Sequence, residues 1–218
     1  MLSEFINVFY IFLSSLFLYK YSDNTRWFYI HCIVNFLVVK YSYYNTMNCI
    51  INYNNCFMIE WNDDTYKTYW TAIHLHLIHL LFFKLTRDDI IHHVLMVLIC
   101  GSLCYYNKSQ LVSLALFFLT GLPGAIDYLL LFLVKVDIIP SIFEKKMYAF
   151  ISSYIRAPGC TTAALLVIPG IIHYYKIKNY YQLICCCLIS FLVFWNGQYY
   201  LSKTLKSYSV NNYILRTK

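Results

Sequence analysis

The stretch RDDIIHHVLMVLICG, residues 87–101, decides the fold class, because it joins two aspartates and two adjacent histidines to an unbroken apolar run. The apolar part continues to Tyr106, close to the length of about 20 residues that a helix needs to cross a bilayer. Ionisable groups are costly inside a bilayer and usually mark a function there. The stretch therefore raises two questions: whether the chain lies in a membrane, and what the histidines do.

The composition favours a membrane protein. The chain has 218 residues, of which 60% are hydrophobic and only 12% are charged, whereas soluble domains have about 25% charged residues. A soluble all-helical fold is the weaker alternative, because its surface would carry large apolar patches. The net charge of +7 is spread without a dense basic run, so it predicts contact with lipid headgroups and no nucleic-acid binding.

The cysteines and histidines do not follow the spacings of metal sites. None of the nine cysteines forms a CxxC pair, so neither a disulfide framework nor a zinc site is predicted. The seven histidines form no HxxxH or HxxHH box, and Asp89 lies three residues before His92. We expect no metal and no cofactor.

Seven segments are predicted to cross the membrane as helices, and the chain is expected to form one all-α domain over residues 1–218, a polytopic membrane helix bundle. Two of the segments are rich in Tyr, His and Thr, so a bundle of six helices is the alternative. In chain order the segments are residues 2–19, 27–44, 66–85, 89–106, 110–134, 147–175 and 180–202.

The distribution of basic residues predicts the orientation, because cytosolic loops are enriched in Lys and Arg. With seven spans, the side that holds the C-terminus carries eleven basic residues: Lys20, Arg26, Lys84, Arg87, Lys135, Lys145, Lys146, Lys203, Lys206, Arg216 and Lys218. The other side carries five: Lys40, Lys67, Lys108, Lys176 and Lys178. We therefore expect a cytosolic C-terminus.

Candidate catalytic residues lie in the opening stretch. On a helix, Asp88 precedes His92 and Asp89 precedes His93 by one turn, and a carboxylate partner would fix the imidazole tautomer and raise its basicity. Such a histidine takes a proton from a hydroxyl or amine, or attacks an acyl carbon. The structural alternative is that the aspartates complement the helix N-terminus and that the histidines lie at the membrane interface.

Other polar residues fall within predicted spans and are candidates to line a cavity: His31, His76, Asp127 and Arg156. An arginine inside a span needs a partner, and Asp127 is the carboxylate placed deepest, so we expect these two to pair. Pro123 and Pro158 are expected to kink their helices.

The order of these features resembles the TLC family, which includes ceramide synthases. The resemblance covers roughly residues 26–202 and is strongest in RDDIIHHVLMVLICGSLCYY, with an acidic residue shortly before the paired histidines. RWFYIHCIVNFLVV is similar to an early helix with a single histidine, TGLPG at 120–124 to a segment with proline, and YAFISSYIR at 148–156 to a late helix ending in arginine.

The resemblance implies a central cavity for an acyl chain in an endoplasmic reticulum-type membrane. Met96 and Pro123 stand where ceramide synthases have Thr and Asp, so binding or handling of an acyl-chain lipid is the favoured function. An acyltransferase with acyl-CoA as substrate and His92 or His93 as base or nucleophile is the alternative. A membrane cargo receptor or assembly factor is the third reading. Whether the chain is an enzyme and whether it forms a homodimer stay open.

Overall fold

The computed structural model describes residues 2–18, 20–54 and 56–216 of the chain. Two sequence expectations touch residues outside these ranges: the end of the first span at Tyr19 and the basic Lys218.

Every element formed by the described residues is a helix, and these residues form no strand. Seven consecutive rods follow one another in this part of the chain: α1 (Leu2–Ser14) with η1 (Ser15–Leu18); α2 (Asp23–Ile51); α3 (Asp63–Phe82); α4 (Arg87–His92) with η3 (His93–Cys100) and α5 (Gly101–Asn107); α6 (Leu111–Leu116) with η4 (Phe117–Gly121) and α7 (Leu122–Lys135); α8 (Ser141–Ile151) with η5 (Ser152–Arg156), α9 (Ala157–Leu165) and α10 (Ile168–Lys176); and α11 (Tyr180–Arg216). A short 3₁₀ turn, η2 (Cys56–Met58), lies between α2 and α3.

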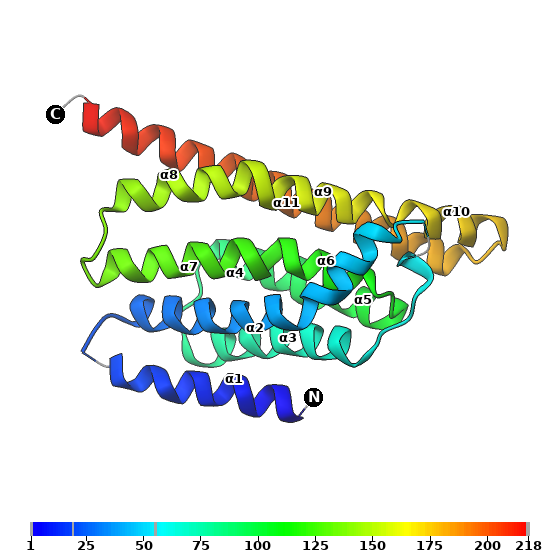
Figure 1. Ribbon diagram of the computed structural model, residues 1–218, viewed down its shortest axis with the longest axis horizontal. Helices are drawn as coiled ribbons and strands as arrows, with labels where there is room; N and C mark the ends of the chain where they lie inside the picture. The colour runs from blue at the N-terminus through cyan, green and yellow to red at the C-terminus, as the bar shows by residue number, and fades with distance from the viewer. Residues whose placement is uncertain (1, 19, 55, 217–218) are drawn as a thin grey trace.

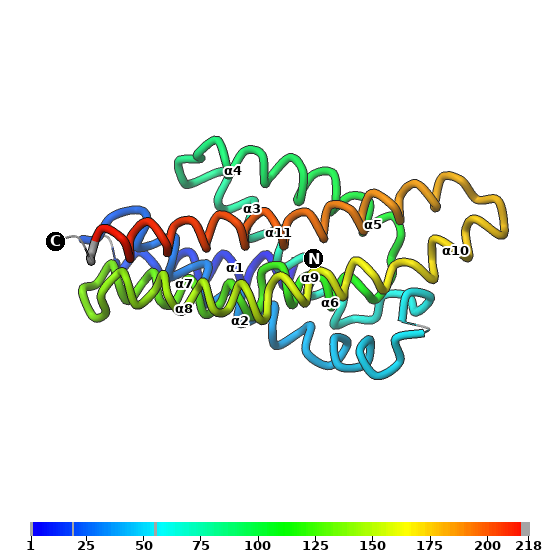
Figure 2. The backbone as a smooth tube through the Cα atoms, turned by 90° about the horizontal axis from the view of Figure 1, so that it is seen from above, coloured from blue at the N-terminus to red at the C-terminus, as the bar shows by residue number. Residues whose placement is uncertain are grey.

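The rods lie side by side in one bundle. In Figure 1, α1 forms one edge, and α8–α9 with α11 form the opposite edge. In Figure 2, α4 and α5 lie on one side of the bundle, and the connection from α2 to α3 lies on the other. The hairpin of α10 and the first turns of α11 extends beyond the remaining helices.

Four of the rods are long and apolar enough to cross a membrane: Arg87–Asn107, Leu111–Lys135, Ser141–Lys176 and Tyr180–Ile214. These four fit an integral membrane protein, whereas seven spans are not shown. The segment Leu2–Leu18 is apolar but short. The expected boundaries also shift, because the sixth rod begins at Ser141 and the last continues to Arg216.

The helices α2 and α3 are not among these four rods, and they contain several polar side chains that are hydrogen-bonded inside the bundle. Asn45 donates to Asn62 Oδ1 at 2.8 Å and to Thr65 Oγ1 at 3.0 Å. Gln110 donates to Asn45 Oδ1 at 2.8 Å, and Ser113 is hydrogen-bonded to Thr65 at 3.0 Å. Buried amides and hydroxyls need such partners, and this network joins α2, α3 and α6.

Three rods contain a π-helical segment, in which the hydrogen bonds run i→i+5. Two of these precede the expected kinks: η4 ends two residues before Pro123, and η5 ends two residues before Pro158. Proline lacks an N–H and its ring crowds the carbonyl four residues earlier, which here belongs to Leu119 in η4 and to Tyr154 in η5. The third segment, η3, contains no proline and begins at His93.

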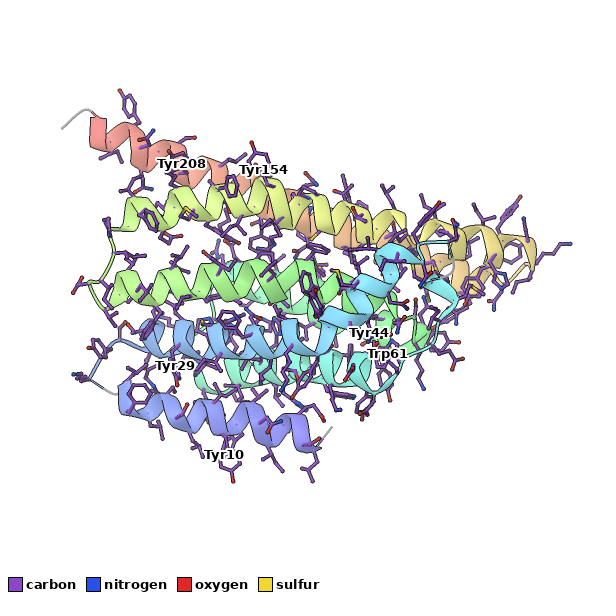
Figure 3. All side chains as sticks on the ribbon, in the orientation of Figure 1. Tyr10, Tyr29, Tyr44, Trp61, Tyr154 and Tyr208 are labelled. Carbon is purple, nitrogen blue, oxygen red and sulfur yellow. The ribbon has the colours of Figure 1, made fainter. Side chains whose placement is uncertain are left out.

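The outer surface of the bundle is apolar and aromatic. Tyr10 on α1 is 67% exposed and Tyr154 in η5 is 71% exposed; Figure 3 labels both on opposite edges of the bundle. Leu81, Leu98 and Phe191 are also more than 60% exposed. Apolar surface of this extent is typical of contact with lipid or a partner.

Candidate functional site

A cavity of about 450 Å³ lies inside the bundle, lined by residues from every rod except α1. Its volume falls within the range of about 300–1,000 Å³ that ligand pockets occupy. All three π-helical segments contribute to its wall, through His93, Thr120 and Arg156. Since π-turns occur often at functional sites, the cavity is the candidate site.

The wall of the cavity changes character along its length. One end is apolar, with Met96, Val97, Cys100, Leu116 and Leu119 among its side chains. The other end holds the histidines together with Lys145, in the first half of α8, and Lys203 and Ser207, in the second half of α11. This gradient suits an amphipathic molecule whose tail and head group need different surroundings.

Five histidines from three helices gather at the polar part of the cavity: His31, His76, His79, His92 and His93. The ring centroids are 5.2 Å apart for His76 and His92, and also for His79 and His93. His31 lies 6.3 Å from His76 by the same measure, and its ring stacks on Tyr128 at 3.8 Å.

The hydrogen bonds of His93 fix its tautomer. Its Nδ1 lies 2.6 Å from the backbone carbonyl oxygen of Asp89. A carbonyl oxygen only accepts, so Nδ1 carries the proton, and the Nε2 of the neutral ring holds a lone pair. That Nε2 is buried and has no hydrogen-bond partner in the protein. It is therefore available to accept a proton from a ligand or to attack a carbon atom of a ligand.

The same reasoning shows which ring nitrogen carries the proton in His76 and in His92. His76 Nδ1 lies 2.7 Å from the carbonyl oxygen of Ala72 and therefore donates to it. In the neutral ring His76 Nε2 then accepts, so His92 Nε2, 3.1 Å away, donates. This leaves a lone pair on His92 Nδ1, which is buried and has no partner in the protein.

The two aspartates do not pair with the imidazoles through their carboxylates, contrary to the expectation from their spacing. The Asp89 carboxylate accepts from the backbone N–H of Thr86 at 2.8 Å and from its hydroxyl at 2.7 Å, completing a capping box that starts α4. The Asp88 carboxylate forms an ion pair with Lys203 on α11. Asp89 thus orients His93 through its backbone carbonyl, while Asp88 ties α4 to α11.

Arg156 is buried beside the cavity, but the expected ion pair with Asp127 is not found. Arg156 Nη1 donates to the Tyr148 hydroxyl at 2.6 Å, and Nη2 donates to Asn196 Oδ1 at 3.2 Å. The guanidinium also lies over the ring of Tyr200, 4.4 Å from its centroid. Asp127 lines the same cavity, and its buried Oδ1 has no hydrogen-bond partner in the protein.

The remaining candidate, His31, lies in the wall of the cavity on α2. Its Nδ1 is 3.0 Å from Asn35 Nδ2, which donates to it, and its ring meets Trp27 edge to face. Six of the predicted residues thus line one cavity: His31, His76, His92, His93, Asp127 and Arg156. The carboxylates of Asp88 and Asp89 instead bind Lys203 and Thr86 and do not contact an imidazole.

Several residues of the site were not singled out from the sequence. Tyr128 lines the cavity, as do Asn196, Tyr200 and Lys203 on α11. The α11 residues are spaced i, i+4 and i+7, a pattern that places them on one face. That pattern was the signal from which they could have been found.

Among the described residues, no three His, Cys, Asp or Glu side chains are arranged to hold a metal ion. No family model, curated protein or solved structure matches this chain significantly. The resemblance to the TLC family, and the functions that it implies, therefore remain predictions.

Proposed function

We propose that this chain is a polytopic membrane protein that binds one acyl-chain lipid in its central cavity. The observation that carries the proposal is the cavity of about 450 Å³ with one apolar end and one histidine-rich end. The apolar end takes the acyl chain by the ordinary gain from burying apolar surface. The imidazoles and the nearby polar groups contact the head group.

Lipid that co-purifies with the protein tests this proposal. The protein is extracted in a mild detergent, and the retained lipids are identified by mass spectrometry. Leu116→Trp fills part of the apolar end and should remove most of the bound lipid. Leu165→Trp is the control, because Leu165 is 57% exposed on the outside of the bundle. Equal retention in the parent and in both variants would show that the lipid lies outside the cavity.

A second candidate function is acyl transfer from acyl-CoA, which the free lone pairs on His92 Nδ1 and His93 Nε2 favour. In this reaction a histidine removes a proton from an amine or hydroxyl, whose nitrogen or oxygen attacks the thioester carbonyl, and CoA leaves as its thiol. Alternatively, the histidine nitrogen attacks first and forms an acyl-imidazole. Either route uses a buried imidazole with an unoccupied nitrogen.

Purified protein with radiolabelled acyl-CoA and a long-chain amine tests the second candidate. His92→Ala and His93→Ala should abolish transfer of the label, whereas His173→Ala, on α10 outside the cavity, should leave it intact. If the parent protein binds lipid and transfers no label, binding is the function.

The membrane arrangement that we propose has seven spans in an endoplasmic reticulum-type membrane, with the C-terminus in the cytosol. Two further observations support more than four spans: α2 and α3 lie within the same bundle as the four apolar rods, and their polar groups are hydrogen-bonded internally. The order of the histidines and Arg156 around one cavity supports membership of the TLC family.

A further inference from the structure

The positive charge of Arg156 is buried without a carboxylate beside it. The side chain is 8% exposed, and its hydrogen-bond acceptors, Tyr148 and Asn196, are neutral. Among the described residues no carboxylate lies within 4.0 Å of the guanidinium. A buried charge is costly unless an opposite charge lies nearby. Asp127 acts on Arg156 electrostatically from the same cavity wall, but no described carboxylate contacts the guanidinium directly.

The guanidinium is also held in place, with one of its three nitrogens left without a partner. It lies over the Tyr200 ring, and Tyr148 and Asn196 each bind one terminal nitrogen. The third nitrogen, Nε, is buried and has no partner in the protein. Because Arg156 is part of the cavity wall, a molecule in the cavity can supply both an acceptor for Nε and a negative charge in direct contact with the guanidinium.

Two lysines and two carboxylates share the cavity wall with Arg156. Lys145 donates to Ser207 at 3.2 Å, and Lys203 pairs with Asp88 at the bundle surface. Asp127 and Glu144 line the cavity as well, but neither lies within ion-pair distance of Arg156. Arginine binds carboxylate and phosphate oxygens with a planar array of donors.

We propose that Arg156 binds the negatively charged head group, a carboxylate or a phosphate, of a lipid whose chain occupies the apolar end of the cavity. This inference rests on the proposed lipid-binding function and adds the charge class of the ligand. It gives Arg156 the role of a binding residue, distinct from the histidines.

Three probes with the same oleyl chain test the charge of the head group on the full-length protein in detergent: oleic acid, oleyl phosphate and the uncharged oleyl alcohol. Binding is measured by equilibrium retention of radiolabelled probe. Inorganic phosphate is added separately as a competitor, to show whether a free anion occupies the site without a chain. The parent protein should bind at least one of the two anionic probes about tenfold more tightly than the alcohol, as expected for a charge-assisted hydrogen bond.

Three variants assign that preference to Arg156. Arg156→Gln should reduce it to near unity, and Arg156→Lys should restore part of it. Asn196→Asp keeps the shape of Asn196 and places a carboxylate against Arg156 Nη2, where it acts as an internal counter-ion. This variant is expected to fold, and it should lower the affinity for the anionic probes about tenfold while leaving the alcohol unchanged. Lys146→Gln is the control, because it removes one positive charge from an exposed position on α8 outside the cavity.

Each outcome decides the question. Preference for oleic acid, for oleyl phosphate or for both, lost in Asn196→Asp and kept in Lys146→Gln, supports the inference and identifies the acid. Competition by inorganic phosphate alone at equal concentration would assign the site to a free anion and overturn the lipid assignment. If the alcohol binds as tightly as the acids, the inference fails and lipid binding stands. If none of the three probes binds, both proposals fail.

Discussion

His76 on α3 and His92 on α4 meet through their Nε2 atoms at a distance of 3.1 Å. The proton of this contact belongs to His92, because His76 donates its own Nδ1 proton to the carbonyl of Ala72. One histidine thereby sets the tautomer of another across the cavity, and the free nitrogen of His92 is its Nδ1.

Replacing His76 with Phe should destabilise the protein, because the buried N–H of His92 loses its acceptor. We expect a loss of about 1–3 kcal/mol in the free energy of unfolding, the cost of leaving a buried polar group unpaired. Thermal unfolding in detergent, followed by tryptophan fluorescence, measures it. His173→Phe on α10 is the control, and an equal loss in both variants would contradict the assignment.

Thr86→Ala should weaken the start of α4 and so disturb His93. The capping box is lost, and caps of this kind contribute about 0.5–2 kcal/mol. Thr86→Ser keeps the hydroxyl and should behave as the parent in the same unfolding measurement. A Thr86→Ala variant as stable as the parent would show that the cap contributes nothing.

Asn45→Leu should be among the more destabilising single changes in the chain. It removes partners from Asn62, Thr65 and Gln110 at once, and each orphaned buried group costs about 1–3 kcal/mol. Asn52→Leu, at an exposed position after α2, should change the melting temperature little. Similar melting temperatures for the two variants would refute the importance of the network.

Ala115→Phe should shorten the acyl chains that the protein retains. A second, apolar cavity of about 30 Å³ shares Cys104, Val112, Ala115 and Val193 with the main cavity, so it extends the apolar end. A phenyl ring at Ala115 closes this extension. Mass spectrometry of co-purified lipids should show the chain-length distribution shift downward; an unchanged distribution would mean that the tail does not reach Ala115.

A tag at the C-terminus should be cleaved when sealed microsomes are treated with protease. The physical reason is the excess of basic residues on the side of the C-terminus, eleven against five by sequence. A protease-resistant tag that becomes sensitive only after detergent is added would place the C-terminus in the lumen and overturn the orientation.

The sequence alone located the helices well, because apolar runs and polar connections alternate along the chain. It could not show that the polar residues of α2 and α3 are turned inward, since Asn45 finds Gln110 only through the tertiary arrangement. Pro123 and Pro158 indicated where two rods deviate from α-helical geometry, and the π-segment at His93 has no comparable marker.

The sequence predicted which residues of one helix lie close together, but it did not predict which partners they find on other helices. Spacing of four residues allowed Asp88 and Asp89 to reach the histidines, but Thr86 and Lys203 compete for the same carboxylates. Similarly, Asp127 was the obvious partner for Arg156, whereas the neutral side chains of Tyr148 and Asn196 occupy its terminal nitrogens. Such competition depends on distances that a linear pattern does not contain.

The π-segments also determine how this chain must be compared with any relative. A turn bonded i→i+5 takes in one residue more than an α-helical turn, so every side chain beyond it is rotated relative to an uninterrupted helix. In a relative that lacks η3, η4 or η5, a one-residue gap belongs inside residues 93–100, 117–121 or 152–156. An alignment without that gap would pair each residue that follows with a neighbour on the wrong face, and a shared cavity would look like an unrelated set of side chains.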